Sequence, residues 1–308
     1  MAALDGKVVV ITGSSRGFGL EAARACAGAG ASVVVSARST ENVNQALAVL
    51  RAGGATAEGW PCDVAELSQV ESLAARTIDR FGHFDVWINN AGVSGTFGPT
   101  AHLEPQDFLR VIDTNIVGTY HGSLVALRHF YPQRGGKLIN ILGRGDTGPV
   151  PLQNAYTASK IWVRSFTKAL AAEYRGDGIG IFAFNPGLML TDLMTDLRAV
   201  AGYEDRLNAL KTVLRLWGKP PAVPAQKLVW LASVATDGKT GLMLRVLTPK
   251  QMAAGVLREG VRRLTGRPAA EIDLHIESVS PALSPRAYPP RTVAEASNGG
   301  TRLGAGQV

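Results

Sequence analysis

The stretch VVVITGSSRGFGLEAARACAGAG, residues 8–30, decides the fold, because it reads as a buried strand, a glycine-rich turn and a helix in immediate succession. Gly13, Gly17 and Gly19 follow the spacing T-G-x-x-x-G-x-G, in which glycines allow a tight turn and close approach of a ligand to the backbone. A pyrophosphate can then sit on the N-terminus of the helix. Because the glycines follow a strand and open a helix, the stretch predicts a dinucleotide-binding βαβ unit.

Short apolar runs alternate with segments of helical period along the first 185 residues. The helical segments are expected near residues 18–29, 66–81, 106–130 and 156–174. The strand-like runs are KVVVIT (7–12), SVVVSA (32–37), DVWINN (85–90), KLINIL (137–142) and GIGIFAFN (178–185). Strands that are apolar on both faces and separated by helices indicate a parallel sheet covered on both sides. The sequence therefore predicts an α/β doubly wound parallel sheet, the Rossmann fold, as a single domain over residues 1–248.

The pattern changes after residue 185. Leucines recur at helical spacing over residues 188–218, which predicts a helical, apolar insert. A lid over a pocket and a helix of the core share this periodicity, so both interpretations stay open. A helix near 225–232 and a strand near 241–246 complete the sheet. The C-terminal extension, residues 249–308, is expected to hold a helix over about 251–264 and then a tail that is disordered after about Ser280.

Composition narrows the classes of protein. The chain has 308 residues, 46% of them hydrophobic, and its charge of +7 is spread without a basic block, which argues against a nucleic-acid partner. Cys26 and Cys62 lack metal-ligand spacing, so we expect no metal site. There is no basic leader and no apolar run of about 18 residues, so we expect neither export nor a membrane span. The expected location is the cytoplasm.

The residues after the second strand indicate which dinucleotide binds. An acidic residue at this point would accept the ribose 2′-hydroxyl of NAD(H), but the position is Ala37, and Arg38 follows. Arg16 lies inside the glycine turn. Because guanidinium groups pair well with phosphate oxygens, Arg16 and Arg38 favour NADP(H).

Tyr156 and Lys160 are four residues apart in YTASK, so on a helix they share one face. A free phenol has a pKa of about 10 and is a poor base at neutral pH. A nearby ammonium and an oxidised nicotinamide ring would both lower the pKa of the phenol. The pair is therefore a candidate for proton transfer to or from a substrate oxygen.

With the glycine turn, NNAG at 89–92 and Tyr156-x-x-x-Lys160 in this order, the chain resembles the short-chain dehydrogenase/reductase family over residues 5–248. The resemblance implies that Asp63 contacts the adenine, that Asn115 holds a water of the proton relay, and that Lys160 also binds the nicotinamide ribose. Pro186, Gly187 and Thr191 would border the nicotinamide carboxamide. Together the expected cofactor-binding residues are Gly13, Ser15, Arg16, Gly17, Phe18, Gly19, Arg38, Asp63, Val64, Asn90, Ala91, Gly92, Tyr156, Lys160, Pro186, Gly187 and Thr191.

Gly143 departs from the family pattern, because a serine usually stands thirteen residues before the tyrosine and donates to the substrate oxygen. Three explanations stay open. The glycine can make room for a bulky substrate, with its own N–H, a water or Thr147 as donor. Asn154 or Arg144 can reach in, although Arg144 and Asp146 are equally explained as a solvated loop pair. The third is that efficient turnover has been lost.

Gly143 together with NPGLMLTDL, residues 185–193, is similar to a branch of the family that includes the chlorophyll b reductases. The leading hypothesis is an NADP(H)-dependent carbonyl reductase or alcohol dehydrogenase that acts on a largely apolar, bulky small molecule. The alternative is a catalytically silent NADP(H)-binding regulatory or scaffold protein. The resemblance also implies a homodimer or homotetramer, built on the helices that hold Asn115 and Tyr156.

Overall fold

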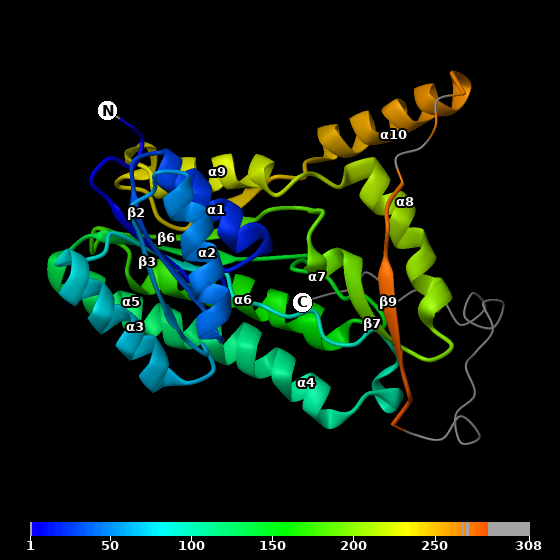
Figure 1. The fold of residues 1–308 in the computed structure, drawn as a ribbon, viewed down its shortest axis with the longest axis horizontal. Coiled ribbons are helices and arrows are strands. Elements are labelled where there is room, and N and C mark those ends of the chain that lie inside the picture. Colours follow the sequence, from blue (N-terminus) through cyan, green and yellow to red (C-terminus); the bar gives the residue numbers. More distant parts are fainter. Residues whose placement is uncertain (1, 267, 269–270, 283–308) are drawn as a thin grey trace.

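The central element is a seven-stranded parallel sheet, seen in a computed structural model that describes residues 2–266, 268 and 271–282 (Figure 1). Its strand order is β3-β2-β1-β4-β5-β6-β8. The strands are β1 (Val8–Ile11), β2 (Ser32–Ala37), β3 (Ala57–Pro61), β4 (Val86–Asn89), β5 (Gly136–Ile141), β6 (Ile179–Asn185) and β8 (Met243–Arg245). The order reverses between β1 and β4, where helices leave toward opposite faces of the sheet. The predicted doubly wound fold is confirmed.

Helices cover both faces of the sheet (Figure 1). One face carries α1 (Gly17–Gly28), α2 (Thr40–Ala52) and α9 (Ala222–Ala232), and the other carries α3 (Leu67–Phe81), α5 (Gly118–Gln133) and α6 (Asn154–Glu173). Val9 and Val33 point into the first apolar core, and Val10 and Val34 into the second. Both sides of each central strand are therefore buried, which explains why these strands are continuous apolar runs in the sequence.

The helix predicted over residues 106–130 is divided in the structure. It consists of α4 (Pro105–Ile112), a π-helical turn (Asp113–Val117) and α5. Such π turns occur frequently at functional sites, and this one contains Asn115. Helix α2 was not among the predicted helices, although Ser39 caps it by accepting a hydrogen bond from the backbone N–H of Asn42 at 3.2 Å.

The prediction of a helical insert over 188–218 is wrong in its first half. That half contains the short helix α7 (Asp192–Thr195) and strand β7 (Asp196–Val200), and a 3-10 turn (Glu204–Leu207) then leads into α8 (Asn208–Trp217). Strand β7 pairs in parallel with β9 (His275–Val279), which comes from the C-terminal extension. Helical spacing misled here because the partner that makes residues 196–200 a strand lies far downstream in the sequence.

The C-terminal extension packs back onto the insert. Helix α10 (Pro249–Leu264) lies against α8, and β9 lies against β7 (Figure 1). Leu274, Ile272 and Ile276 join Leu197 and Leu214 in an apolar cluster separate from the two cores of the sheet. Strand β9 was not predicted, and the tail predicted to be disordered falls on residues 283–308, outside the described residues. The insert therefore has a small core of its own, shared with the extension.

Two further 3-10 turns, Thr100–His102 and Val234–Thr236, complete the secondary structure of the described part. Within residues 2–266, 268 and 271–282, no helix combines the length and the apolar character needed to cross a membrane.

Candidate active site

The glycine turn between β1 and α1 is locked against the end of β4. Gly13 has a φ of 60°, and a Cβ built there would lie 2.7 Å from the Ala91 Cα. The Thr12 hydroxyl accepts from the backbone N–H groups of Asn90 (3.0 Å) and Ala91 (3.1 Å). The Asn90 amide donates to the carbonyls of Thr12 (3.0 Å) and Gly13 (2.9 Å). Only glycine fits at position 13, and the turn and NNAG form one rigid unit.

The N-terminus of α1 is open to an anion. Arg16 occupies the N-cap position without a side-chain capping bond, so the first N–H groups of the helix remain available. Ser15 is half-buried in the turn. Phe18, by contrast, is buried and stacks on Phe184 with ring centroids 6.0 Å apart. Its side chain belongs to the core, so only its backbone can touch a dinucleotide.

The two arginines expected at the cofactor lie on the surface. Arg38 is exposed directly after the last residue of β2. Arg16 is exposed as well, and its Nη1 lies 3.3 Å from Asp192 Oδ2. Next to Asp192, Thr191 lies 3.7 Å from the place where a Cβ on Gly17 would stand. The loop after β6 therefore arches over to the glycine turn.

The other expected cofactor residues follow the carboxyl ends of β3, β4 and β6. Asp63 accepts from the backbone N–H of Ala65 at 3.0 Å, and Val64 is buried beside it. Pro186 is buried, and Gly187 has a φ of 81° and donates to the Asn185 side chain at 2.9 Å. The structure thus gathers the predicted residues at the carboxyl ends of the strands, and the binding of a pyrophosphate at the turn stays a prediction.

Tyr156 and Lys160 lie in the first turns of α6, and both are buried, with exposed fractions of 9% and 5%. Lys160 Nζ donates to the Ile141 carbonyl at 3.1 Å and lies 5.7 Å from the centre of the Tyr156 ring. A Cβ on Gly92 would stand 3.6 Å from the same nitrogen. The predicted proximity of phenol, amine and NNAG is therefore present.

In the protein without cofactor, burial is the main cause of the pKa shifts of Tyr156 and Lys160. It raises the pKa of Tyr156 to about 12, with a smaller lowering by Arg144 and a smaller raising by Asp146. Burial also lowers the pKa of Lys160 to about 8. Desolvation disfavours the charged forms of both groups, and the expected lowering of the phenol pKa by an oxidised nicotinamide stays a prediction. The phenol is a proton donor in this state.

Asn115 connects the loop after β4 to the tyrosine helix. Its Oδ1 accepts from the Val93 N–H at 2.9 Å, and its Nδ2 donates to the Val93 carbonyl and to Ser159 Oγ, each at 3.0 Å. Ser159 Oγ in turn donates to the Tyr156 carbonyl at 2.6 Å. The fully buried side chain is therefore a structural clamp, and the expected contact with a water stays a prediction.

Gly143 lies directly against the tyrosine. A Cβ built on Gly143 would fall onto the Tyr156 hydroxyl and stand 3.2 Å from the Tyr156 Cζ. The Tyr156 hydroxyl thus fills the space in which a serine side chain at 143 would begin. The position has no room for a serine unless the tyrosine moves, so the glycine and the tyrosine position depend on each other.

The sequence missed a buried carboxylate behind Gly143. Asp146 is only 3% exposed and accepts from Arg164 (3.1 Å), Arg245 (2.9 Å) and the Asn185 amide (3.2 Å). The Asn185 amide also donates to the Gly143 carbonyl at 3.1 Å. The interpretation of Arg144 and Asp146 as a solvated loop pair is therefore wrong for Asp146. Its partners come from α6, β6 and β8, so no local pattern identifies them.

Of the remaining substrate candidates, Asn154 lines a small space beside Tyr156, whereas Thr147 does not. Thr147 is exposed, and Asn154 is half-buried, donates to the Thr100 hydroxyl and accepts from the Ala155 N–H at 2.6 Å. The space itself is about 10 Å³ and is lined by Asn154, Tyr156 and residues of the loop after β4. It can hold about one water.

The insert covers this side of the site. In the loop after β4, the Phe97 N–H donates to the Arg198 carbonyl at 2.8 Å, and the Val200 N–H donates to the Phe97 carbonyl at 2.9 Å. Strand β7 is therefore bonded directly to the loop beside Tyr156.

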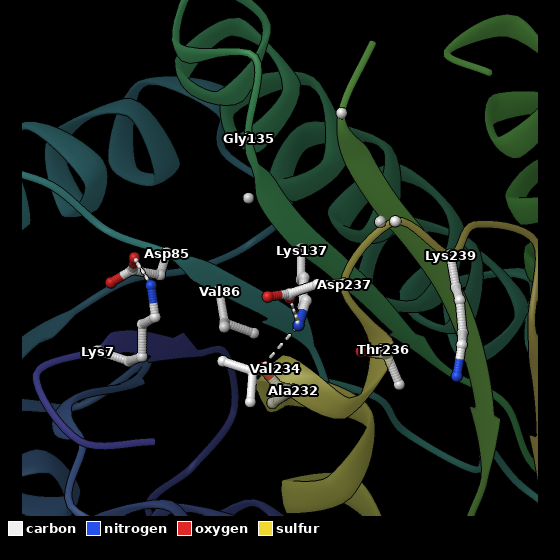
Figure 2. A pocket seen from close by; sticks show the side chains of 14 residues that line it. Lys7, Asp85, Val86, Gly135, Lys137, Ala232, Val234, Thr236, Asp237 and Lys239 are labelled. Atoms are coloured by element: carbon white, nitrogen blue, oxygen red, sulfur yellow. Dashed lines mark hydrogen bonds and ion pairs between the residues drawn. The ribbon is translucent and has the colours of Figure 1, made fainter. Parts of the chain in front are cut away.

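A larger pocket, about 250 Å³, lies at the amino ends of the strands, opposite the glycine turn (Figure 2). Its charged groups are paired: Lys7 with Asp85 at 2.9 Å and Lys137 with Asp237 at 2.7 Å. Lys239 donates to the Ala235 carbonyl. Ligands of open α/β sheets bind at the carboxyl ends of the strands, whereas Lys7 and Lys137 flank the amino ends. We therefore do not assign this pocket to the dinucleotide.

Known proteins match both the sequence and the fold. The family model for short chain dehydrogenases matches residues 7–201. A probable chlorophyll(ide) b reductase of Oryza sativa subsp. japonica is 30% identical over 274 residues, 83% of this chain and 52% of that protein. A variant of actinorhodin polyketide ketoreductase, solved with NADPH, has a TM-score of 0.72 and 30% identity over 80% of this chain and 97% of that one. The 3-ketoacyl-(acyl-carrier-protein) reductase of Brucella melitensis, solved with NADH, has a TM-score of 0.71 and 28% identity over 79% of this chain and 97% of that one.

Replacing Gly143 tests its contact with the tyrosine. We expect Gly143→Ala to lower the rate of the reaction at least ~10-fold, because the new methyl group displaces the Tyr156 hydroxyl. Gly148→Ala is the matched control, since a Cβ there meets nothing within 4 Å. Steady-state rates measure both variants. Faster turnover in a Gly143→Ser variant would contradict this account and point to an eroded site.

Removing the buried amine tests its cost to the fold. We expect Lys160→Met to raise the free energy of unfolding at pH 7 by about 1 to 2 kcal/mol, because burying the ammonium costs about 3 kcal/mol and the lost hydrogen bond to the Ile141 carbonyl offsets part of the gain. The pKa of Lys160 is lowered from 10.5 to about 8, so the gain is full below pH 8 and disappears between about pH 8 and 10.5. Urea unfolding of the protein without cofactor measures it.

The exposed Lys168 on the same helix supplies the control for this experiment. Lys168→Met should leave the free energy of unfolding unchanged at pH 7 and at about pH 10.5. A Lys160→Met variant that is less stable than the wild type at pH 7 would show that the Lys160 amine is not a destabilising buried charge.

Proposed function

Because the chain belongs to the short-chain dehydrogenase/reductase family, we propose that it is an NADP(H)-dependent oxidoreductase that interconverts a carbonyl and an alcohol. The observation that carries the proposal is the buried pair of Tyr156 and Lys160, which lies beside NNAG at the carboxyl ends of the strands. The family supports an oxidoreductase of ketone or alcohol groups, while the cofactor and the substrate are our inference.

The glycine turn fits a dinucleotide, since Gly13 leaves no room for a Cβ and the N-terminus of α1 is uncapped. Arg38 would pair with the 2′-phosphate, and Arg16 could join it by exchanging its exposed ion pair with Asp192, which is worth little in water. Lys160 would bind the nicotinamide ribose, and Gly187 and Thr191 would border the carboxamide. The NADPH complex of the related polyketide ketoreductase supports this choice, although the Brucella relative was solved with NADH.

The chain's own residues manage the proton. When bound, the nicotinamide ring gives or accepts the hydride. Tyr156 donates its hydroxyl proton to the substrate oxygen during reduction and recovers it from the alcohol during oxidation. Burial raises the pKa of Tyr156 to about 12 in the protein without cofactor, so the phenol carries its proton there. Asn115 fixes the tyrosine helix through Ser159 and would hold the relay water.

We propose an apolar, bulky small molecule as substrate. The insert that covers the site is rich in leucine, and one relative is named for a pigment substrate. The Tyr156 hydroxyl would itself hold the substrate oxygen from the place that a serine fills elsewhere in the family, with Gly143, Thr147 and Asn154 as the candidate contacts around it. The silent-protein alternative was motivated by Gly143 and by the C-terminal extension; the close packing of Tyr156 on Gly143 favours the enzyme over it.

We also propose an assembly of two or four copies through α5 and α6, which expose Tyr120, Tyr131 and Ile161. The proposed location is the cytoplasm, in keeping with the free, buried Cys26 and Cys62. Residues 1–248 would form the cofactor-binding domain, with residues 249–308 as an extension of it.

The Tyr156→Phe variant tests the proton transfer. We expect the reduction of a panel of ketones, followed by NADPH absorbance, to slow by about 10²- to 10⁴-fold, because the proton donor is lost. The affinity for NADPH should stay within about threefold, since the ring remains. Tyr174→Phe, near the end of the same helix, is the control and should retain full activity. Equal rates for wild type and Tyr156→Phe would exclude the mechanism.

The Arg38→Ala variant tests the cofactor. Hydrogen bonds between charged groups contribute about 1.5 to 3 kcal/mol, so we expect NADPH to bind roughly 10- to 100-fold more weakly and NADH to be almost unaffected. Asp192→Ala, which releases Arg16, should retain or tighten NADPH binding. Fluorescence titration of both dinucleotides measures these effects. Tighter binding of NADH than of NADPH by the wild type would refute the assignment.

A further inference from the structure

Helix α10 presents an apolar face to solvent. Met252, Val256, Leu257, Val261 and Leu264 are exposed by 41%, 56%, 70%, 50% and 89%. At 100° per residue, the last four fall on one side of the helix, where Ala253, Gly260 and the charged Lys250 lie between them. A helix on the surface of a globular protein normally turns its apolar stripe inward, so this exposed apolar face indicates a binding surface.

The opposite side of α10 fixes this orientation. Gly255 is buried against α8, where a Cβ would lie 2.7 Å from the Leu216 carbonyl oxygen and from the Trp217 ring. The Trp217 indole donates to the Met252 carbonyl at 3.0 Å, and Arg258 donates to the Leu216 carbonyl at 2.8 Å. A capping box of Thr248 and Gln251 starts the helix. The exposed face therefore cannot turn inward without breaking these contacts.

The charges of α10 select the kind of occupant. The helix carries Lys250, Arg258, Arg262 and Arg263 against a single acid, Glu259. Glu259 is already bound to Arg262 (2.7 Å), Arg263 (3.1 Å) and Arg215 (3.6 Å). A second copy of the helix would bring like charges together, whereas an anionic surface would complement them.

We propose that α10 docks on an anionic lipid membrane, with its apolar face among the headgroups and its cationic flanks against the lipid phosphates. An apolar face combined with a basic polar face is the pattern of helices that lie in the plane of a membrane surface. Because α10 packs on α8, docking brings the insert that covers Tyr156 to the lipid. The delivery of an apolar substrate from the membrane rests on the proposed function, whereas docking itself does not.

The test is flotation of the full-length protein with vesicles of phosphatidylcholine alone or with about 30% phosphatidylglycerol. We expect binding to the anionic vesicles that weakens with salt and falls at least ~10-fold in the double variant Leu257→Glu, Leu264→Glu. Both leucines are largely exposed, so the variant should fold, which its melting temperature verifies. Val234→Glu, an equally exposed apolar position away from α10, is the control and should bind like the wild type.

Three results would overturn the proposal: no binding to anionic vesicles, equal binding by the double variant, or equal binding to neutral vesicles. A change in the mass of the assembly in the double variant, without a change in vesicle binding, would assign the face to a second copy instead. Reduction of a water-soluble ketone should be unchanged in the double variant, since neither leucine lies at the site. Failure of that activity in the wild type would count against the proposed function and not against docking.

Discussion

The hydrogen bonds of Asn90 and Thr12, which join the glycine turn to the end of β4, are the constraint on which the rest of the site depends. They act between β1 and β4, where the strand order of the sheet reverses. The cofactor turn and the catalytic helix approach each other across this junction. A Cβ on Gly92 would stand 3.3 Å from the Asn115 side chain and 3.6 Å from Lys160 Nζ. Any displacement of the turn would therefore be passed to the proton-transfer pair.

The site opposes the stability of the fold that holds it. A phenol and an amine are buried together, and desolvation penalises the charged form of each. Stable packing would favour an apolar residue at 160, and the proposed chemistry accounts for an amine at this position. Gly143 contributes to the burial of the phenol, because the absence of a side chain lets the Tyr156 hydroxyl approach the backbone after β5. The buried Asp146, bound to Arg164 and Arg245, supports that backbone from behind.

The insert and the C-terminal extension form a second structural layer around the site. Strand β7 bonds to the loop after β4 on one side and to β9 on the other. Helix α8 carries α10. The apolar cluster of this layer is separate from the two cores of the sheet.

The sequence by itself determined the parallel sheet, the glycine turn and the pairing of Tyr156 with Lys160, because each depends on short-range spacing: apolar runs, glycines in one turn, and two residues one helical turn apart. Only the tertiary structure decided what depends on distant partners. Strand β7 exists because β9 returns to it, and Asp146 is buried because Arg164, Asn185 and Arg245 converge on it from three elements. The contact of Gly143 likewise appears only once α6 is folded against β5. The sequence shows only that the serine usual in the family is a glycine here, whereas the structure places the Tyr156 hydroxyl where that serine side chain would begin.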